Sequence, residues 1–322
     1  MTDKNEDKNT VKGKTHYAPN KLHHRWNNEI PPTMTIKSGD VVIYELPDVS
    51  NCQMHHEATV DTYINLDYNL MHPLVGPIYI EEAKPGDTLE IEILDIHTKG
   101  WGWTIAVPGK GLLGDELENH YLRVFDLSNG DYIPFNDYIQ VPIEPFLGTM
   151  GVAPAEKGEF GIIPPNYHGG NMDVRSLTKG ARLYLPVQVP GALFSTGDGH
   201  AAQGDGEVSL TAVESPTYAA LRFKVNKDKK ISSPHFLTAP NTNKNSIEDK
   251  GYYATTGIGP DLKECARDAI RNMIDYLRRE HKLSWEDAYI LCSIAANLRI
   301  NEIVDMPNYV VSAYLPVGIF KY

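Results

Sequence analysis

The chain has 322 residues, 41% of them hydrophobic, which is enough to bury a sizeable core. A formal net charge of −12, with no run of Lys and Arg, argues against a nucleic-acid partner. No stretch approaches the ~18 uninterrupted apolar residues of a membrane span, and the N-terminus lacks an apolar signal segment, so we expect a cytoplasmic protein with no membrane partner.

Short β-prone runs dominate the first two thirds of the chain. Residues 1–15 precede them and are polar, which predicts a disordered tail. From residue 16 to 225, apolar runs alternate with Gly, Pro and Asp, which predicts a β-rich catalytic core. The runs are DVVIYEL, TVDTYINL, GPIYIEEA, DTLEIEILDI, YIQVPI, ARLYLPVQV, EVSLTAV and ALRFKV.

Residues 226–322 have a different pattern. Between residues 261 and 281 the apolar side chains form one helical stripe, with Asp261 as the N-cap. A second helix is predicted from Ser284, with Asp287 in the capping-box position, and YVVSAYLPV predicts a final strand. We therefore expect a mainly β protein: a β-sandwich or barrel core with an α+β C-terminal section packed on it.

Acids, glycines and one histidine gather in STGDGHAAQGDGEV, residues 195–208. One residue separates Asp198 from His200, and Asp205 from Glu207, so in extended backbone each pair lies on one face. These side chains offer carboxylate oxygens and one imidazole nitrogen to a cation. The imidazole favours zinc over calcium, which prefers oxygen ligands. The alternative is a solvent-exposed hairpin in which Asp-Gly is only turn chemistry.

The upstream segment HGGNMDV repeats this spacing with Asn171 and Asp173. An amide can orient a carbonyl group and a carboxylate can bind a metal or act as a base, but both are also ordinary loop residues. HHEATVDTY offers at most His55 and Glu57 to one face of a strand, and we interpret His72, which precedes a proline, as structural. The chain has no G-x-S-x-G nucleophile elbow, which disfavours covalent catalysis.

Four longer segments follow one another from about residue 16 to the end of the chain. They are HPLVGPIYIEEAKPGDTLEIEI, PFLGTMGVAPAEKG, GGNMDVRSLTKGARLYLPVQVPGALFSTGDGHAAQGDGEV and YVVSAYLPVGIF. In this order they resemble the acetamidase/formamidase family. The resemblance implies hydrolysis of small aliphatic amides, formamide or acetamide, to the carboxylate and ammonia. It also implies a β-sandwich, a divalent metal and a homo-oligomer of two or more subunits.

The family's motifs fall on the segments described above. Its Gly-Gly-Asn-Met-Asp stretch corresponds to residues 169–173, its Gly-Asp-x-His stretch to 197–200 and its Gln-Gly-Asp-Gly-Glu stretch to 203–207. Two positions depart from the family. Glu82 stands where the family usually has a glycine. If the turn that contains Glu82 borders the site, its side chain would narrow the site or change its charge. Leu210 follows Ser209 where a small residue is usual, which bears on substrate preference more than on the reaction.

From the resemblance and the donor types together, we predict a metal site formed by Asp173, Asp198 and His200. Zinc is the expected ion and calcium is the alternative. The metal would activate water and polarise the amide carbonyl. Two other functions stay open: an inactive relative that binds a small ligand around a structural metal, and a hydrolase of another C–N bond, in a larger amide or a urea derivative.

The predicted catalytic residues are Glu207, Asp205 and Asn171. Glu207 would be the general base that takes a proton from water and returns it to the departing ammonia. Its pKa would have to be raised, either by burial or by the neighbouring Asp205. Asn171 and backbone N–H groups of the glycine-rich loop would steady the developing oxyanion.

Overall fold

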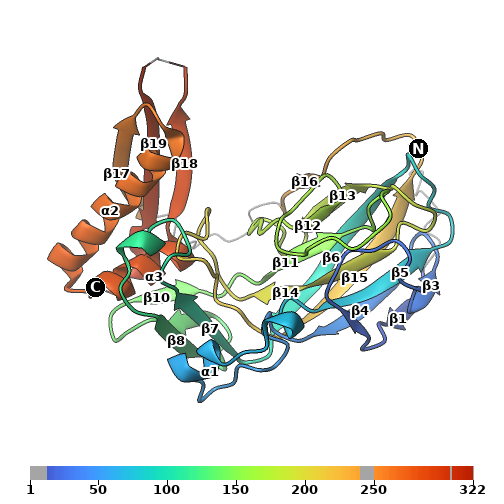
Figure 1. The fold of residues 1–322 in the computed structure, drawn as a ribbon, viewed down its shortest axis with the longest axis horizontal. Helices are drawn as coiled ribbons and strands as arrows, with labels where there is room; N and C mark the ends of the chain where they lie inside the picture. Colours follow the sequence, from blue (N-terminus) through green and yellow to red (C-terminus); the bar gives the residue numbers. More distant parts are fainter. Residues whose placement is uncertain (1–12, 240–249, 305–306, 322) are drawn as a thin grey trace, which may run out of the picture.

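The computed structural model describes residues 13–239, 250–304 and 307–321 (Figure 1). Two six-stranded sheets pack face to face as a β-sandwich, and helices with a three-stranded sheet form the C-terminal section beside it. This confirms the mainly β fold. Of the predicted tail, residues 1–12 lie outside the described residues, whereas β1 already begins at Thr15.

The first sheet of the sandwich has the strand order β1-β4-β15-β6-β13-β16. The bounds of its strands are β1 (Thr15–Tyr17), β4 (Val41–Leu46), β15 (Thr217–Asn226), β6 (Thr88–Thr98), β13 (Arg182–Pro186) and β16 (His235–Leu237). Alternate residues of β4 are fully buried, as the sequence pattern predicts for a strand with one face on a core. Because β16 pairs with β13, the sandwich extends past residue 226, the predicted start of the C-terminal section.

The second sheet has the order β12-β11-β14-β5-β2, and β3 pairs with β5. The bounds of its strands are β12 (Gly169–Asn171), β11 (Phe146–Gly151), β14 (Phe194–His200), β5 (Leu74–Ile80), β2 (Leu22–His23) and β3 (Met34–Ile36). Ile78 and Phe194 from this sheet meet Phe223 from the other in one hydrophobic core. The core excludes water between the sheets and fixes the edge β12-β11-β14, which carries most of the site described below.

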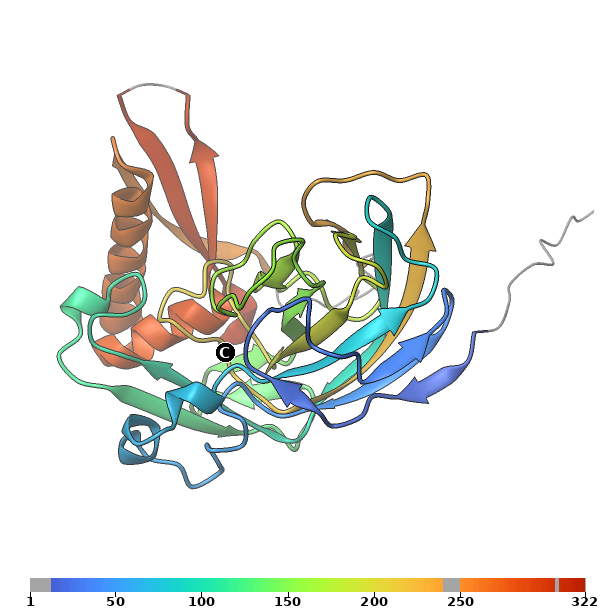
Figure 2. The same cartoon turned by 45° about the vertical axis from the view of Figure 1, so that its right-hand side comes forward.

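A second core joins the C-terminal section to two hairpins. The hairpins are β7 (Trp101–Ala106) with β8 (Tyr121–Asp126), and β9 (Tyr132–Pro134) with β10 (Gln140–Pro142). The C-terminal section consists of β17 (Tyr252–Gly259), α2 (Leu262–His281), α3 (Trp285–Ala295), β18 (Asn297–Glu302) and β19 (Tyr309–Pro316). In Figure 2, α2 stands beside the sheet β17-β19-β18. Among the described residues, no helix combines the length and the apolar character that a bilayer span requires.

Both predicted helices begin at their predicted caps. Asp261 accepts a hydrogen bond from the backbone N–H of Glu264, and Ser284 accepts one from that of Asp287. The second cap is only half of a capping box. The Asp287 carboxylate accepts hydrogen bonds from Arg123 and Tyr121 on β8, so it ties α3 to the hairpin and does not return to the backbone of Ser284.

Two predicted strands are not strands. The run TVDTYINL contains α1 (Val60–Ile64), because Thr59 caps the helix and exchanges hydrogen bonds with Thr62. HHEATVDTY is therefore a turn leading into a helix, and His55 and Glu57 are exposed there. EVSLTAV is a series of turns, because Glu207 and Leu210 have left-handed backbone, with φ of 45° and 112°.

Candidate functional site

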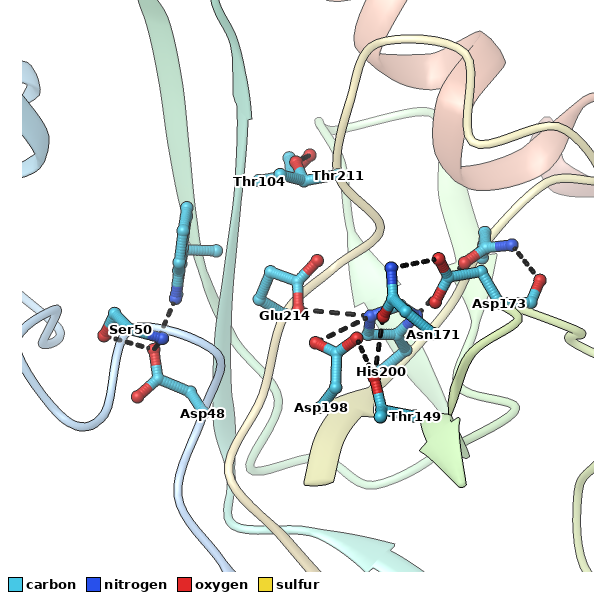
Figure 3. Close-up of polar contacts among 12 residues, drawn as sticks. Asp48, Ser50, Thr104, Thr149, Asn171, Asp173, Asp198, His200, Thr211 and Glu214 are labelled. Carbon is cyan, nitrogen blue, oxygen red and sulfur yellow. Dashed lines mark hydrogen bonds and ion pairs between the residues drawn. The ribbon is translucent and has the colours of Figure 1, made fainter. Parts of the chain in front are cut away.

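The strand order β12-β11-β14 brings together residues that lie far apart in the sequence. β14 carries Asp198 and His200, while β12 ends at Asn171, two residues before Asp173. One ligand atom from each of Asp173, Asp198 and His200 lies within 4.8 Å of the others, so these residues form a candidate metal-ligand group. Figure 3 shows them converging, with His200 at the centre.

Gly148 on β11 leaves the space into which this group points. A Cβ atom at residue 148 would lie 2.5 Å from Asp173 Oδ1 and 2.7 Å from Asp198 Oδ2. Both distances are shorter than any ordinary non-bonded contact, so any side chain here would push the two carboxylates apart. The absence of a side chain therefore creates a cradle between the two acids.

The acids of the site sit on strained backbone. Asp173, Asp198 and Glu207 have φ of 49°, 61° and 45°, in the left-handed region that residues other than glycine rarely adopt. Each such residue costs on the order of 1–3 kcal/mol and persists only where the surrounding structure enforces it. The spacing of Asp198 and His200 predicts that both lie on one face of an extended strand. The positive φ of Asp198 shows that the backbone between them is not regularly extended. The left-handed turn at Asp198 directs its carboxylate toward the imidazole instead.

Two of the glycines near these acids serve packing and not backbone freedom. A Cβ atom at Gly199 would lie 2.3 Å from Thr217 Oγ1, and one at Gly204 would lie 2.0 Å from the carbonyl oxygen of Ala296. Neither glycine has a positive φ, whereas Asp198, which precedes Gly199, does. These glycines let other backbone segments approach the site closely.

Gln203 fixes the orientation and tautomer of His200. The Gln203 side-chain N–H donates to the carbonyl oxygen of Asp173 at 2.8 Å, which leaves its Oε1 facing His200 Nδ1 at 3.1 Å. Because Oε1 can only accept, Nδ1 must carry a proton. His200 Nε2 then faces Asp198 Oδ1 at 3.4 Å and Glu214 Oε2 at 3.2 Å. A nitrogen between two carboxylates must be protonated or share a cation with them.

Glu214 is a member of the site that the sequence patterns did not indicate. It is buried, and its backbone exchanges hydrogen bonds with Trp103 of β7 while also bridging to His200. Together with His200 and Glu207 it forms a second candidate ligand group that shares the imidazole with the first. In the sequence Glu214 is a single acid in the apolar run TAVESP, and only its contacts reveal its role.

Burial and mutual repulsion shift the pKa values of the carboxyl groups. Burial, with the nearby Asp198, raises the pKa of Asp173 to about 7, and burial also raises that of Glu214 to about 7. Burial, and next Asp173, raise the pKa of Glu207 well above its usual range. For Asp198, the effect of burial is outweighed by His200, which lowers its pKa.

The charge balance and the unpaired oxygen of the site fit a divalent cation. Four carboxyl groups surround one imidazole, Asp173 Oδ1 is buried without a hydrogen-bond partner, and Glu214 Oε2 has only the ion pair with His200 Nε2. Burial opposes a charge on His200, but Glu214 and Asp198 outweigh burial and raise its pKa well above its usual range, so the acids favour a positive charge at this position. Carboxylate oxygens with an imidazole nitrogen are a donor set that zinc accepts, so the residues present fit a metal.

The other predicted site residues have different positions. Asp205 is exposed, its backbone is tied to Asn297 and Leu298, and it is not among the charges that shift the pKa of Glu207. The structure therefore does not bring Asp205 into the group: Gly206 has a φ of 107°, and the turn there directs the two acids apart. Glu82 accepts a hydrogen bond from the backbone of Ser38 in an exposed turn away from the cavity.

Asn171 reaches the site but its amide is already engaged. Its Oδ1 accepts from the Thr149 hydroxyl at 2.7 Å, and its Nδ2 donates to Asp173 Oδ2 at 3.0 Å. Asn171 thus orients Asp173, with one amide hydrogen left to face the cavity. This arrangement fits a positioning residue better than the oxyanion donor that the sequence predicts.

A cavity of about 490 Å³ opens onto the acids. Asn171, Asp173, Asp198, His200, Glu207 and Glu214 line its inner end. His72 lines it as well, with a φ of 52° and a buried Nδ1 that has no hydrogen-bond partner. The prediction that His72 is merely structural therefore misses that it forms part of the cavity wall. Burial lowers the pKa of His72, which favours its neutral form there.

Comparisons with known proteins agree on a family. A model of the acetamidase/formamidase family matches residues 9–159 and 155–322. The chain is 26% identical to a formamidase of Methylophilus methylotrophus, over 94% of this chain and 90% of that protein. It is 27% identical to an acetamidase of Mycolicibacterium smegmatis, over 58% of this chain and 61% of that protein.

Solved structures show the same likeness. The structure superposes with a TM-score of 0.86 on a gamma lactamase from Delftia acidovorans, at 24% identity over 94% of this chain and 90% of that chain. At this identity the likeness shows a shared fold. An acetamidase from Bacillus halodurans superposes with a TM-score of 0.66, at 32% identity over 94% of this chain and 96% of that chain.

The cradle at Gly148 gives a first prediction. In Gly148→Ala, the added Cβ separates Asp173 from Asp198, and we expect zinc affinity to fall by at least about tenfold. The measurement is zinc binding by calorimetry, with circular dichroism to show that the variant folds. Gly259→Ala is the matched control, because a Cβ on this strand residue contacts only Cys265 Sγ, at 3.8 Å. Wild-type zinc affinity in a folded Gly148→Ala would contradict the cradle.

Proposed function

The chain belongs to the acetamidase/formamidase family and is an amidohydrolase, and we propose that its buried acid group hydrolyses linear amides of the formamide and acetamide type. The observation that carries this proposal is the convergence of four carboxyl groups on His200 at the inner end of a cavity. The products are a carboxylate and ammonia. The oxygen of water bonds to the carbonyl carbon, the C–N bond breaks, one proton of the water goes to the departing nitrogen, and the other is released as the carboxylate forms.

A divalent cation, zinc in our proposal and calcium in the alternative, would be held by Asp173, Asp198 and His200. When bound, such an ion supplies Lewis acidity and lowers the pKa of water near it. Gln203 supports this by keeping Nε2 of His200 turned toward the carboxylates, and Asn171 keeps Asp173 in place. Such supporting hydrogen bonds hold the ligands in one geometry before the substrate arrives.

Glu207 is the general base in our proposal. It lines the cavity, its backbone is fixed by a hydrogen bond to Gly204, and its raised pKa suits a group that takes a proton from water and later releases it to nitrogen. Glu214 is closer to His200 and belongs to the second candidate ligand group. We assign Glu214 to the electrostatic support of His200.

The test of the function is ammonia release from formamide and acetamide by the purified protein. We expect release that disappears with a chelator and returns when zinc is added back. Release that a chelator does not affect would keep the amidase function but remove the metal from it. Absence of release from any amide, in a protein that binds metal, would favour an inactive relative with a structural metal.

A substitution of Glu207 tests whether this residue is the general base and not a metal ligand. In Glu207→Gln we expect metal content to stay at the wild-type level while kcat falls by at least about a hundredfold, because the proton acceptor is lost. Asp205→Asn is the matched control from the same loop, since it removes an exposed carboxylate, and it should keep wild-type turnover. A fully active Glu207→Gln would remove Glu207 from the reaction.

The raised pKa values give a prediction for pH. Because Asp173 and Glu214 have pKa values of about 7, the folded metal-free protein holds protons that the unfolded chain has already released. Its stability therefore falls as pH rises from about 5 to about 8. Metal ions replace these protons, so zinc should raise the Tm more at about pH 8 than at about pH 6. Equal increases at both pH values would show that zinc binding releases no proton from the site.

Two further expectations remain predictions. The homo-oligomer implied by the family resemblance can be tested by measuring the mass of the protein in solution. The cytoplasmic location, expected from the sequence, can be tested by fractionating cells that express the full chain.

A further inference from the structure

We propose that the preferred substrate is a primary amide whose apolar acyl chain ends in a carboxylate, and that Lys110 and Arg25 bind this carboxylate at the mouth of the cavity. The proposal rests on the amidase function above, because it names the substrate class of the same site. It follows from three properties of the cavity: its size, its apolar wall and the positions of its charges.

The cavity is too large for the smallest amides alone. Its volume of about 490 Å³ is within the range of sites that hold drug-sized ligands. Acetamide has four non-hydrogen atoms and would fill on the order of 100 Å³, taking about 30 Å³ for each water-sized group. Most of the cavity would then contain water. A longer acyl chain would displace this water from apolar surface.

The wall between the acids and the mouth is apolar and well fixed. Val49, Tyr63, Trp103, Met71 and Leu210 line the cavity and belong to one hydrophobic cluster. The Trp103 indole donates a hydrogen bond to the buried Asp48 at 2.9 Å, which holds its ring in place. Leu210 packs against the same cluster and adds apolar surface to the wall close to Glu207.

The charges of the cavity are separated. All of its carboxyl groups lie at the inner end, so a substrate carboxylate would be repelled there while a neutral amide would not. The basic residues of its lining are Arg25 and Lys110, both exposed. Among the described residues, no carboxylate lies within ion-pair distance of either cation. Unpaired cations are notable in a chain with a net charge of −12.

Aromatic rings connect the inner end to Lys110. The backbone of Trp103 is hydrogen-bonded to that of Glu214, and the ring centroid of Tyr63 is 6.0 Å from that of Trp103 and 6.3 Å from that of Tyr68. Lys110 Nζ lies 5.6 Å from the ring centroid of Tyr68. A substrate that follows this wall from the acids would therefore reach the ammonium group with its far end.

The loop of Lys110 is anchored to the catalytic loop. Lys110 N–H donates to the carbonyl oxygen of Val107 at 3.0 Å, and Leu112 N–H donates to that of Val208 at 2.8 Å. Gly111 packs so closely against Ser209 that a Cβ there would lie 2.9 Å from its carbonyl oxygen. The ammonium group is thus attached to backbone that is hydrogen-bonded and closely packed to the segment between Glu207 and Leu210, which suits a substrate-binding role.

The experiment compares three amides by kcat/KM for ammonia release: acetamide, the monoamide of adipic acid, and a neutral amide of the same length with an isopropyl group in place of the carboxylate. We expect both longer amides to exceed acetamide, by about fourfold for each methylene that becomes buried. The carboxylated amide should exceed the neutral one by roughly fivefold through two exposed ion pairs. Added salt should reduce this ratio, because it screens exposed charges.

Substitutions of the two cations test whether they cause the preference for the carboxylated amide. In Lys110→Gln and Arg25→Gln, the ratio of kcat/KM between the carboxylated and the neutral amide should fall toward one, and Lys110→Glu should reverse it. Lys263→Gln is the matched control, because Lys263 is exposed on α2 and does not line the cavity, and it should keep the wild-type ratio.

The possible outcomes distinguish failure of this substrate inference from failure of the amidase function. Equal kcat/KM for the carboxylated and the neutral amide, with clear release from acetamide, would overturn the inference and leave the amidase function. A ratio that survives both Gln variants would overturn the roles of Lys110 and Arg25. Absence of ammonia from all three amides would overturn the function itself. Release from the longer amides alone would support the inference and exclude acetamide as a substrate.

Discussion

The structure depends on the electrostatics of four carboxyl groups held around one buried imidazole. In a medium of low dielectric constant these acids cannot all ionise without a compensating cation, because each repels the others. The surrounding residues hold this arrangement in place: Gly148 leaves the space between two acids, and Gln203 and Asn171 fix the donors. Three acids with left-handed backbone add conformational strain, which the packing of both cores must offset.

The C-terminal section positions the acidic loop of the sandwich. The Ser293 carbonyl oxygen on α3 accepts from Gly204 N–H at 2.7 Å, and its hydroxyl lies between Ser209 N–H and the Thr211 carbonyl oxygen, at 3.1 and 2.9 Å. Ala201 and Val208 on this loop belong to the same core as the two helices. The site therefore lies at the seam between two hydrophobic cores, and neither core alone would place Glu207 opposite β14.

Local patterns predicted the features that local interactions determine. The caps at Asp261 and Ser284 and the alternation of β4 depend on residues within one turn or one strand, so the sequence reveals them. The positions of Asp205 and Glu214 depend on tertiary contacts, so the sequence patterns misplace the first and do not indicate the second. The Asp-x-Glu spacing suggests that Asp205 and Glu207 cooperate, but a left-handed turn separates them. Glu214 enters through backbone pairing with Trp103, which lies more than a hundred residues away in the sequence.

The family resemblance and the cavity constrain different parts of the function. Two of the motifs that carry the resemblance, residues 169–173 and 197–207, supply acids at the inner end, and they therefore bear on the reaction. The wall and mouth come from other segments, including α1, the loop around Lys110, and Leu210. The substrate that we propose depends on this division, because the charges that would act on the amide lie at the opposite end of the cavity from those that would recognise the rest of the molecule.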